Sequence, residues 1–167
     1  LLRHFCLTQF IIARPKPAPA ETICSVSIVV PCKNEKGNIA ELVERIPVFS
    51  GGLEVIFIDG RSSDGTADEV RRVAALHQQK NVRLMPQENS VGKGAAVREA
   101  FAAAAGDVLM ILDADISVAP EDTRKFYDLV VSGLGECVNG TRMVYPMEKQ
   151  AMRFLNVLGN KFFSTAF

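Results

Sequence analysis

The sequence has no excess of charge of either sign. Nineteen lysine and arginine residues balance nineteen aspartate and glutamate residues, so the formal net charge is zero. A protein that binds nucleic acid or an anionic surface through its overall charge needs a basic excess. We therefore expect no nucleic-acid partner, and any phosphate binding must depend on a local group of residues.

Cysteine is scarce as well. The 167 residues include four cysteines, and none of them forms a Cys-x-x-Cys pair. This spacing argues against a zinc site and against a disulfide-stapled miniprotein. The sequence also shows no signal-peptide pattern and no run of about eighteen apolar residues that could cross a membrane. We expect reduced thiols and a cytoplasmic protein.

The composition is that of a protein with a substantial core. Hydrophobic residues make up 48% and charged residues 23% of the chain, which predicts one compact domain and excludes a disordered or collagenous chain. Residues 1–20 stand apart, because a short apolar run leads into the Pro/Ala-rich segment 15–20. We expect them to be either the tail of a preceding domain or an extension packed on the main domain, residues 21–167.

From Val26 onward, apolar strand-like runs alternate with helical patterns. Such a pattern predicts an α/β fold with a parallel sheet and helices on both faces. Strands are expected at residues 26–30, 53–58, 82–85, 108–112 and 136–140, the first one ending at Pro31. Helices are expected at residues 38–46, 66–79, 94–105 and 120–131.

Polar residues follow each predicted strand, at the edge of the sheet where parallel-sheet proteins bind ligands. Asp113 and Asp115 follow the fourth strand. Two carboxylates separated by one small residue suit Mg²⁺ or Mn²⁺ that bridges a diphosphate. In many loops an Asp-x-Asp triplet only caps backbone N–H groups or is solvated. Its position directly after an apolar strand favours the metal site here.

Three other loops have two interpretations each. Lys93, between two glycines before a helix, either binds phosphate with the helix N-terminus or is a solvated lysine in a flexible turn. Asp59 either accepts hydrogen bonds from a base or ribose or caps its own loop. The Asp64-Gly65-Thr66 triplet is expected to cap the next helix through Asp64 or Thr66.

Five segments together resemble, in order, the nucleotide-sugar-binding half of glycosyltransferase family 2. The similarity is to the branch that includes dolichyl-phosphate mannose synthases and bacterial polyprenyl-phosphate sugar transferases. The segments are residues 28–35 (IVVPCKNE), 58–66 (IDGRSSDGT), 92–96 (GKGAA), 112–115 (LDAD) and 139–142 (NGTR).

The resemblance implies a GT-A fold, with a Rossmann-like, mostly parallel sheet and helices on both faces. It also implies a nucleoside-diphosphate sugar as donor, with Mg²⁺ or Mn²⁺ as cofactor. In this comparison Pro31, Asn34 and Glu35 surround the nucleoside, Asp59 contacts base or ribose, and Lys93 lies near it.

The remaining matched residues concern the phosphates. The resemblance implies that Asp113 and Asp115 bind the metal and the diphosphate, and that Arg142 faces a phosphate of the donor or of a lipid-phosphate acceptor. Asp115 and Arg142 are therefore the expected catalytic residues. The expected reaction moves the sugar to an acceptor, a polyprenyl phosphate in this branch.

Two positions depart from the family pattern. Gly60 stands where the family usually has a second aspartate, which removes a possible nucleoside contact and blurs the base preference. Ser117 stands where mannose synthases often have a glutamine that helps to hold the metal. This second departure weakens the assignment to the mannosyl subgroup.

The last residues, 143–167, have one apolar face edged by cations. This pattern fits a surface helix at a bilayer, with peripheral contact at the cytoplasmic face of a membrane, or an ordinary amphipathic helix packed on the core. Because family members continue beyond this point, we expect a domain truncated at its C-terminal end that binds donor without transferring sugar.

Two other classes of function compete with a glycosyltransferase. One is a non-catalytic module that binds nucleotide sugar without turnover. The other is a phosphoacceptor receiver domain with Asp59 as the acceptor. A receiver needs a pair of acids just after the first strand, whereas this sequence has only Glu35 there.

Overall fold

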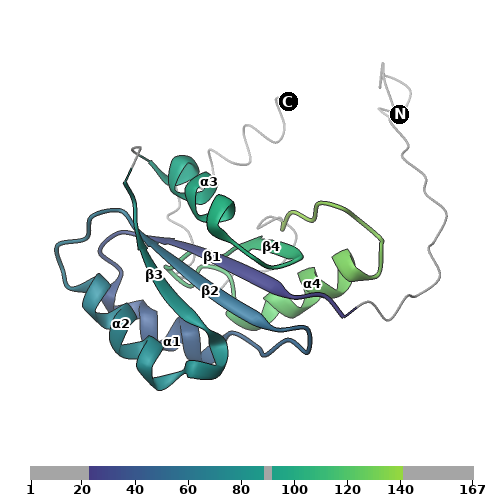
Figure 1. The fold of residues 1–167 in the computed structure, drawn as a ribbon, viewed down its shortest axis with the longest axis horizontal. Coiled ribbons are helices and arrows are strands. Elements are labelled where there is room, and N and C mark those ends of the chain that lie inside the picture. The colour runs from purple at the N-terminus through teal and green to yellow at the C-terminus, as the bar shows by residue number, and fades with distance from the viewer. Residues whose placement is uncertain (1–22, 89–91, 141–167) are drawn as a thin grey trace, which may run out of the picture.

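The computed structural model describes residues 23–88 and 92–140. Four strands form one parallel sheet in the order β3-β2-β1-β4. The strands are β1 (Val26–Cys32), β2 (Leu53–Asp59), β3 (Val82–Pro86) and β4 (Val108–Ile111). Because all four run in the same direction, their carboxyl ends meet at one edge of the sheet (Figure 1).

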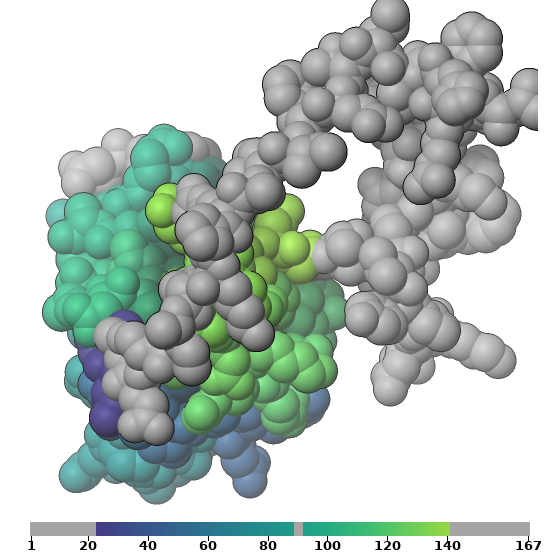
Figure 2. All heavy atoms as spheres, turned by 90° about the vertical axis from the view of Figure 1, so that its right-hand side faces the viewer, coloured from purple at the N-terminus to yellow at the C-terminus, as the bar shows by residue number. Residues whose placement is uncertain are grey.

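Helices cover both faces of this sheet, as Figure 1 shows, with α1 and α2 on one side and α3 on the other. The predicted α/β class and parallel sheet are thus confirmed. The helices are α1 (Lys36–Arg45), α2 (Thr66–Leu76), α3 (Lys93–Ala103) and α4 (Thr123–Val131), with 3-10 turns η2 (Gln78–Lys80) and η3 (Pro120–Asp122). On the face drawn in Figure 2, α3 and the chain from β4 onward make up most of the coloured surface.

The core has two layers because the central strands bury both of their faces. Val29 of β1 and Ile56 of β2 pack against α3, while alternate residues of the same strands pack against α1 and α2. Strands buried on both sides need the continuous apolar runs that the sequence shows. The apolar face predicted for α1 is also confirmed, since its members are fully or almost fully buried: Ile39, Leu42, Val43 and Ile46.

The first strand does not end at Pro31, as the sequence suggested, but continues to Cys32. Backbone groups along β1 point alternately to its two neighbours: the Leu112 N–H donates to the Val29 oxygen, and the Gly60 N–H donates to the Cys32 oxygen. Pro31 therefore faces the β4 side, where the pairing ends at Val29. Its missing N–H costs the described sheet no hydrogen bond, so proline is tolerated there.

The strand predicted over residues 136–140 is wrong, because this segment carries no regular structure. Its residues are exposed apart from Val138, which is half-buried, so the segment has no apolar face to bury. The helix predicted over residues 66–79 is interrupted at His77, where α2 gives way to the turn η2. The first helix begins at Lys36, two residues before Asn38.

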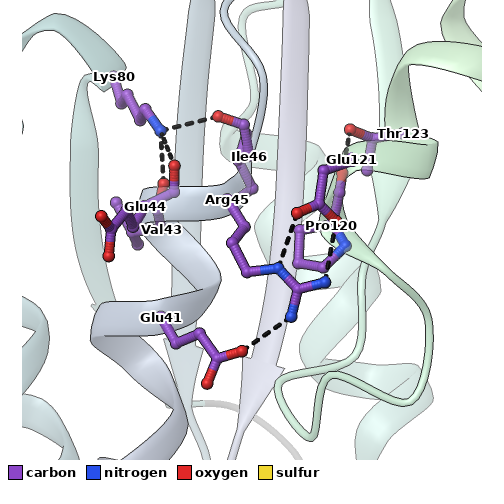
Figure 3. Close-up of polar contacts among 9 residues, drawn as sticks. All are labelled: Glu41, Val43, Glu44, Arg45, Ile46, Lys80, Pro120, Glu121 and Thr123. Carbon is purple, nitrogen blue, oxygen red and sulfur yellow. Dashed lines mark hydrogen bonds and ion pairs between the residues drawn. The ribbon is translucent and has the colours of Figure 1, made fainter.

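The C-terminal end of α1 is capped by a buried lysine from η2 (Figure 3). The ammonium group of Lys80 donates to the carbonyl oxygens of Val43, Glu44 and Ile46 at 2.6, 2.9 and 2.7 Å. Carbonyl groups at a helix end lack intrahelical donors, and they carry partial negative charge. Lys80 therefore joins α1 to the chain that enters β3.

Arg45 joins the same helix to the chain after β4. Its guanidinium group donates to both carboxylate oxygens of Glu121 at 2.7 and 3.0 Å, and also to Glu41 at 2.8 Å (Figure 3). The paired bonds fix the orientation of Glu121 as well as its distance. In this way η3, and with it the end of the loop that follows β4, is attached to α1.

Among residues 23–88 and 92–140, the structure contains no helix that is both long enough and apolar enough to span a bilayer.

Candidate functional site

The loops after β1 and β2 are joined by a single serine. The Ser62 hydroxyl accepts the backbone N–H of Asn34 at 2.9 Å and donates to a carboxylate oxygen of Asp59 at 2.5 Å. The Ser62 N–H also lies 3.2 Å from both oxygens of that carboxylate. The Asn34 side chain completes the connection by accepting the Ser63 N–H at 2.8 Å. Two of the predicted site residues, Asn34 and Asp59, thus belong to one hydrogen-bonded unit.

The backbone in this unit adopts uncommon conformations. Asn34 and Arg61 have φ angles of 57° and 62°, in the left-handed region that non-glycine residues seldom enter. Asparagine tolerates this region better than most residues, and the bonds to Ser62 and Ser63 hold it there. Such conformations gather at functional sites, where surrounding structure enforces them.

Asp64 caps two helices at once. One carboxylate oxygen accepts the N–H of Lys36, the first residue of α1, at 3.1 Å, and the other accepts the N–H of Thr66, the first residue of α2, at 2.9 Å. The Thr66 hydroxyl, which also donates to this carboxylate, and the two backbone N–H groups lower the pKa of Asp64. The Thr66 hydroxyl itself accepts the N–H of Glu35 at 2.9 Å. The triplet thus caps α2 through the Asp64 carboxylate, one of the two predicted ways, although Gly65 holds the N-cap position. The Thr66 hydroxyl also positions Glu35.

The loops after β3 and β4 are joined by an ion pair between Lys93 and Asp113. Lys93 is the first residue of α3 and follows Gly92, whose φ of 103° suits only glycine without strain. The Asp113 side chain is 27% exposed and that of Lys93 is 58% exposed. The structure therefore brings together the residue predicted to bind phosphate and one predicted to bind metal.

Asp115 is oriented by its own loop. One of its carboxylate oxygens accepts the backbone N–H of Ser117 at 3.0 Å, across Ile116, whose φ is 53°. Ser117 thus contacts Asp115 through its backbone N–H.

The residues after β4 fit a divalent cation of the hard type. Asp113 and Asp115 offer carboxylate oxygens one residue apart, the donors that Mg²⁺ and Mn²⁺ prefer. In this structure the Asp113 carboxylate already holds a positive group, the ammonium of Lys93. Asp113 and Asp115 are two ligands only. Among the residues that the structure describes, no group of three or more His, Cys, Asp or Glu side chains is placed to hold a metal ion.

A cavity of about 390 Å³ lies beside Asp59, between α2 and the end of β3. Its lining residues are two charged ones, Asp59 and Arg71, and three apolar ones: Ala67, Leu84 and Pro86. Nothing in the sequence singles out Arg71, which also pairs with Asp68 at 2.7 Å.

Ser62 is the other site residue that the sequence reasoning missed. A signal was available, because a serine three residues after an aspartate in a loop often turns back to bond that side chain. Of the remaining predicted residues, Pro31 pairs with Ile58 at the end of the sheet, and Arg142 lies outside the described residues.

The family model described as glycosyl transferase family 2 matches residues 27–164. The chain therefore belongs to this family, as the motif resemblance indicated.

Its curated relatives include two proteins named dolichol-phosphate mannosyltransferase. That of Saccharomyces cerevisiae is 36% identical over 61% of this chain and 39% of its own length, and that of Pyrococcus furiosus is 31% identical over 71% and 33%. The undecaprenyl-phosphate 4-deoxy-4-formamido-L-arabinose transferase of Aeromonas hydrophila is 33% identical over 65% and 34%. The chain spans between a third and two fifths of the length of these relatives.

A solved structure with a similar fold is the mannosyltransferase PcManGT of Pyrobaculum calidifontis, determined in complex with GDP-Man and Mn²⁺. Its TM-score is 0.56 at 30% identity, over 73% of this chain and 35% of that one. Together with the parallel sheet and its helices, this similarity confirms the GT-A fold.

Proposed function

We propose that this domain binds a nucleoside-diphosphate sugar together with a divalent cation, and that the protein transfers the sugar to an acceptor. The observation that carries the proposal is the contact between Lys93 and Asp113, the cation that we assign to phosphate and a carboxylate that we assign to the metal. A metal-bound diphosphate needs both groups at one point. Membership of glycosyl transferase family 2 supports the same reaction.

The nucleoside is assigned to the loops after β1 and β2. Pro31, Asn34 and Glu35 come from the first loop, and Asp59 accepts hydrogen bonds from the base or ribose. The proposal is supported by the open pocket beside Asp59, whose lining joins two charged residues to three apolar ones and so suits a planar polar heterocycle. Ser62 holds Asp59 in place for this role.

The diphosphate is assigned to Asp113, Asp115 and Lys93, with Arg142 as a further phosphate contact. A bound Mg²⁺ or Mn²⁺ ion supplies charge that stabilises the leaving diphosphate. Asp113 and Asp115 hold that charge in place, while Lys93 and Arg142 place cationic groups on the phosphate oxygens. By analogy with the family, the anomeric carbon inverts.

The acceptor we propose is a polyprenyl phosphate, because the relatives that carry such lipids in their names match this chain. A phosphate nucleophile is already ionised near neutral pH, so the reaction needs no strong general base. A lipid acceptor would place the protein at the cytoplasmic face of a membrane, with residues 21–167 as its transferase domain.

The proposal is tested first by binding. The thermal unfolding midpoint is measured with GDP, UDP, GDP-mannose and UDP-glucose, each with and without Mn²⁺. We expect the midpoint to rise with one nucleotide family only, and only when Mn²⁺ is present, because a ligand that binds the native state stabilises it. No shift with any nucleotide would contradict the proposal.

Transfer of labelled sugar to polyprenyl phosphate by the full-length protein then distinguishes an enzyme from a binding module. Metal-dependent nucleotide binding without any transfer would favour the non-catalytic alternative.

A further inference from the structure

The ion pair between Lys93 and Asp113 poses a conflict for the proposed site. Asp113 is one of the carboxylates assigned to the cation, yet it already holds the ammonium group of Lys93. The same ammonium is assigned to the diphosphate. The pair therefore competes with both proposed roles, because Lys93 repels a cation at Asp113 and Asp113 repels a phosphate at Lys93.

We propose that Lys93 couples the binding of cation and nucleotide: it holds Asp113 before the donor binds, and moves to the diphosphate as the carboxylate takes the cation. This inference rests on the proposed function and adds to it a defined role for one residue. Lys93 is in this sense a positioning residue for Asp113 and a binding residue for the donor.

The charges explain why the two ligands should favour each other. A divalent cation that binds alone competes with Lys93 for Asp113 and lies close to its positive charge, which is repulsive. A diphosphate that binds alone meets the carboxylates of Asp113 and Asp115. With both ligands bound, Asp113 and Asp115 would hold the cation and Lys93 would face the phosphate, so every charge would have an opposite partner.

The position of Lys93 allows this exchange. Its backbone begins α3 directly after Gly92, close to the Asp113 loop. Its side chain is 58% exposed, so the ammonium can leave Asp113 without opening a cavity or breaking a packed contact. Lysine also carries its charge on a flexible four-carbon stem, unlike the planar group of arginine.

The test has two titrations. Electron paramagnetic resonance of free Mn²⁺ measures Mn²⁺ binding without nucleotide, and calorimetry measures the binding of GDP or UDP in the presence of Mn²⁺. The variant is Lys93→Met, which removes the charge and keeps the apolar stem. The control is Lys125→Met on α4, because Lys125 also pairs with an aspartate, Asp122, at 2.7 Å, but outside the site. Thermal unfolding of both variants checks that the fold is intact.

We expect opposite changes in the two titrations of Lys93→Met. Mn²⁺ alone should bind about fivefold more tightly, because an exposed ion pair no longer competes for Asp113. The nucleotide, in the presence of Mn²⁺, should bind about tenfold more weakly, because a charged hydrogen bond to phosphate is lost. Lys125→Met should change neither affinity.

Other outcomes separate the two proposals. If wild-type protein binds neither nucleotide in Mn²⁺, the proposed function fails. If wild type binds nucleotide and Lys93→Met weakens it while Mn²⁺ alone binds as before or more weakly, Lys93 is only a phosphate ligand or a structural residue. In that case the coupling role is overturned and the proposed function stands.

Discussion

Ser62 binds Asp59 twice, through its backbone N–H and through its hydroxyl, and so fixes the direction of the carboxylate at the end of β2. The same hydroxyl accepts the N–H of Asn34 from the loop after β1. One side chain thus determines the relative position of two loops that come from different strands. The geometry of the proposed nucleoside site depends on Ser62, although Ser62 is not assigned a contact with the nucleoside.

Ser62→Ala should therefore weaken nucleotide binding more than it weakens the fold. We expect a loss of affinity of several-fold and a loss of about 1–2 kcal/mol in the free energy of unfolding, because hydrogen bonds to a carboxylate and a backbone N–H disappear. Calorimetric titration and urea unfolding measure the two effects. Ser63→Ala is a matched control, since the Ser63 hydroxyl makes only a 3.5 Å contact with Asn34. Equal effects of the two substitutions would contradict this role of Ser62.

Asp115→Asn should abolish metal-dependent nucleotide binding while leaving the fold intact. The asparagine side chain retains an oxygen that can accept the Ser117 N–H, so the turn after β4 is preserved. It lacks the negative charge that a divalent cation requires. We expect the Mn²⁺-dependent rise of the unfolding midpoint with nucleotide to vanish. Asp128→Asn, which removes an exposed ion pair with Arg124 on α4, should leave that rise unchanged. A normal response of Asp115→Asn to Mn²⁺ would remove Asp115 from the metal site.

Lys80→Met should lower stability without changing nucleotide binding. Lys80 is almost fully buried and donates to three carbonyl groups at the end of α1, and methionine leaves all three without this donor. A buried polar group that loses its partner costs about 1–3 kcal/mol, so the free energy of unfolding should fall by at least this amount. Chemical denaturation measures the loss. If Lys80→Met is as stable as wild type, other donors must satisfy these carbonyl groups.

The sequence predicted the elements that have strong patterns. The apolar runs of β1, β2 and β4 and the amphipathic face of α1 follow from burial alone, and the position of the site follows from the parallel order of the strands. The strand prediction for residues 136–140 was wrong. This short run has only one partly buried apolar residue, Val138, so it has no apolar periodicity that could support a strand. Whether such a short segment becomes a strand depends on whether another strand lies beside it to form hydrogen bonds. The sequence alone does not show whether that strand is present.

Contacts between loops were the least predictable part of the site. Lys93 and Asp113 are twenty residues apart, and each was singled out for its own chemistry, but nothing in the sequence indicates that they meet. The same holds for Asp64, whose capping of α2 was expected and whose bond to α1 was not. Local signals such as helix caps lie in neighbouring residues, whereas these contacts depend on how separate loops converge at the edge of the sheet.

Cys32, at the end of β1, should be an inert thiol in the folded protein. Burial, with the nearby carboxylates of Asp59, Glu35 and Asp64 as smaller contributions, raises the pKa of Cys32 to about 12. The thiolate, rather than the thiol, reacts with alkylating reagents. At pH 8 we expect iodoacetamide to modify the exposed Cys137 and to leave Cys32 unmodified until the protein unfolds, as peptide mapping by mass spectrometry would show.

The same shift predicts how stability depends on pH. In the unfolded chain the Cys32 thiol ionises near its ordinary pKa of about 8.5, while the folded protein keeps the proton up to about pH 12. The raised pKa therefore costs no stability below about pH 8.5, and stability falls by about 1.4 kcal/mol per pH unit above it, until the folded thiol also ionises. Unfolding free energies of wild type and Cys32→Ala, measured from pH 7 to 11, isolate this contribution, because only the difference in slope between them belongs to Cys32. Cys137→Ala serves as control and should keep the wild-type slope. Parallel curves for wild type and Cys32→Ala would show that the folded protein does not hold the proton on Cys32.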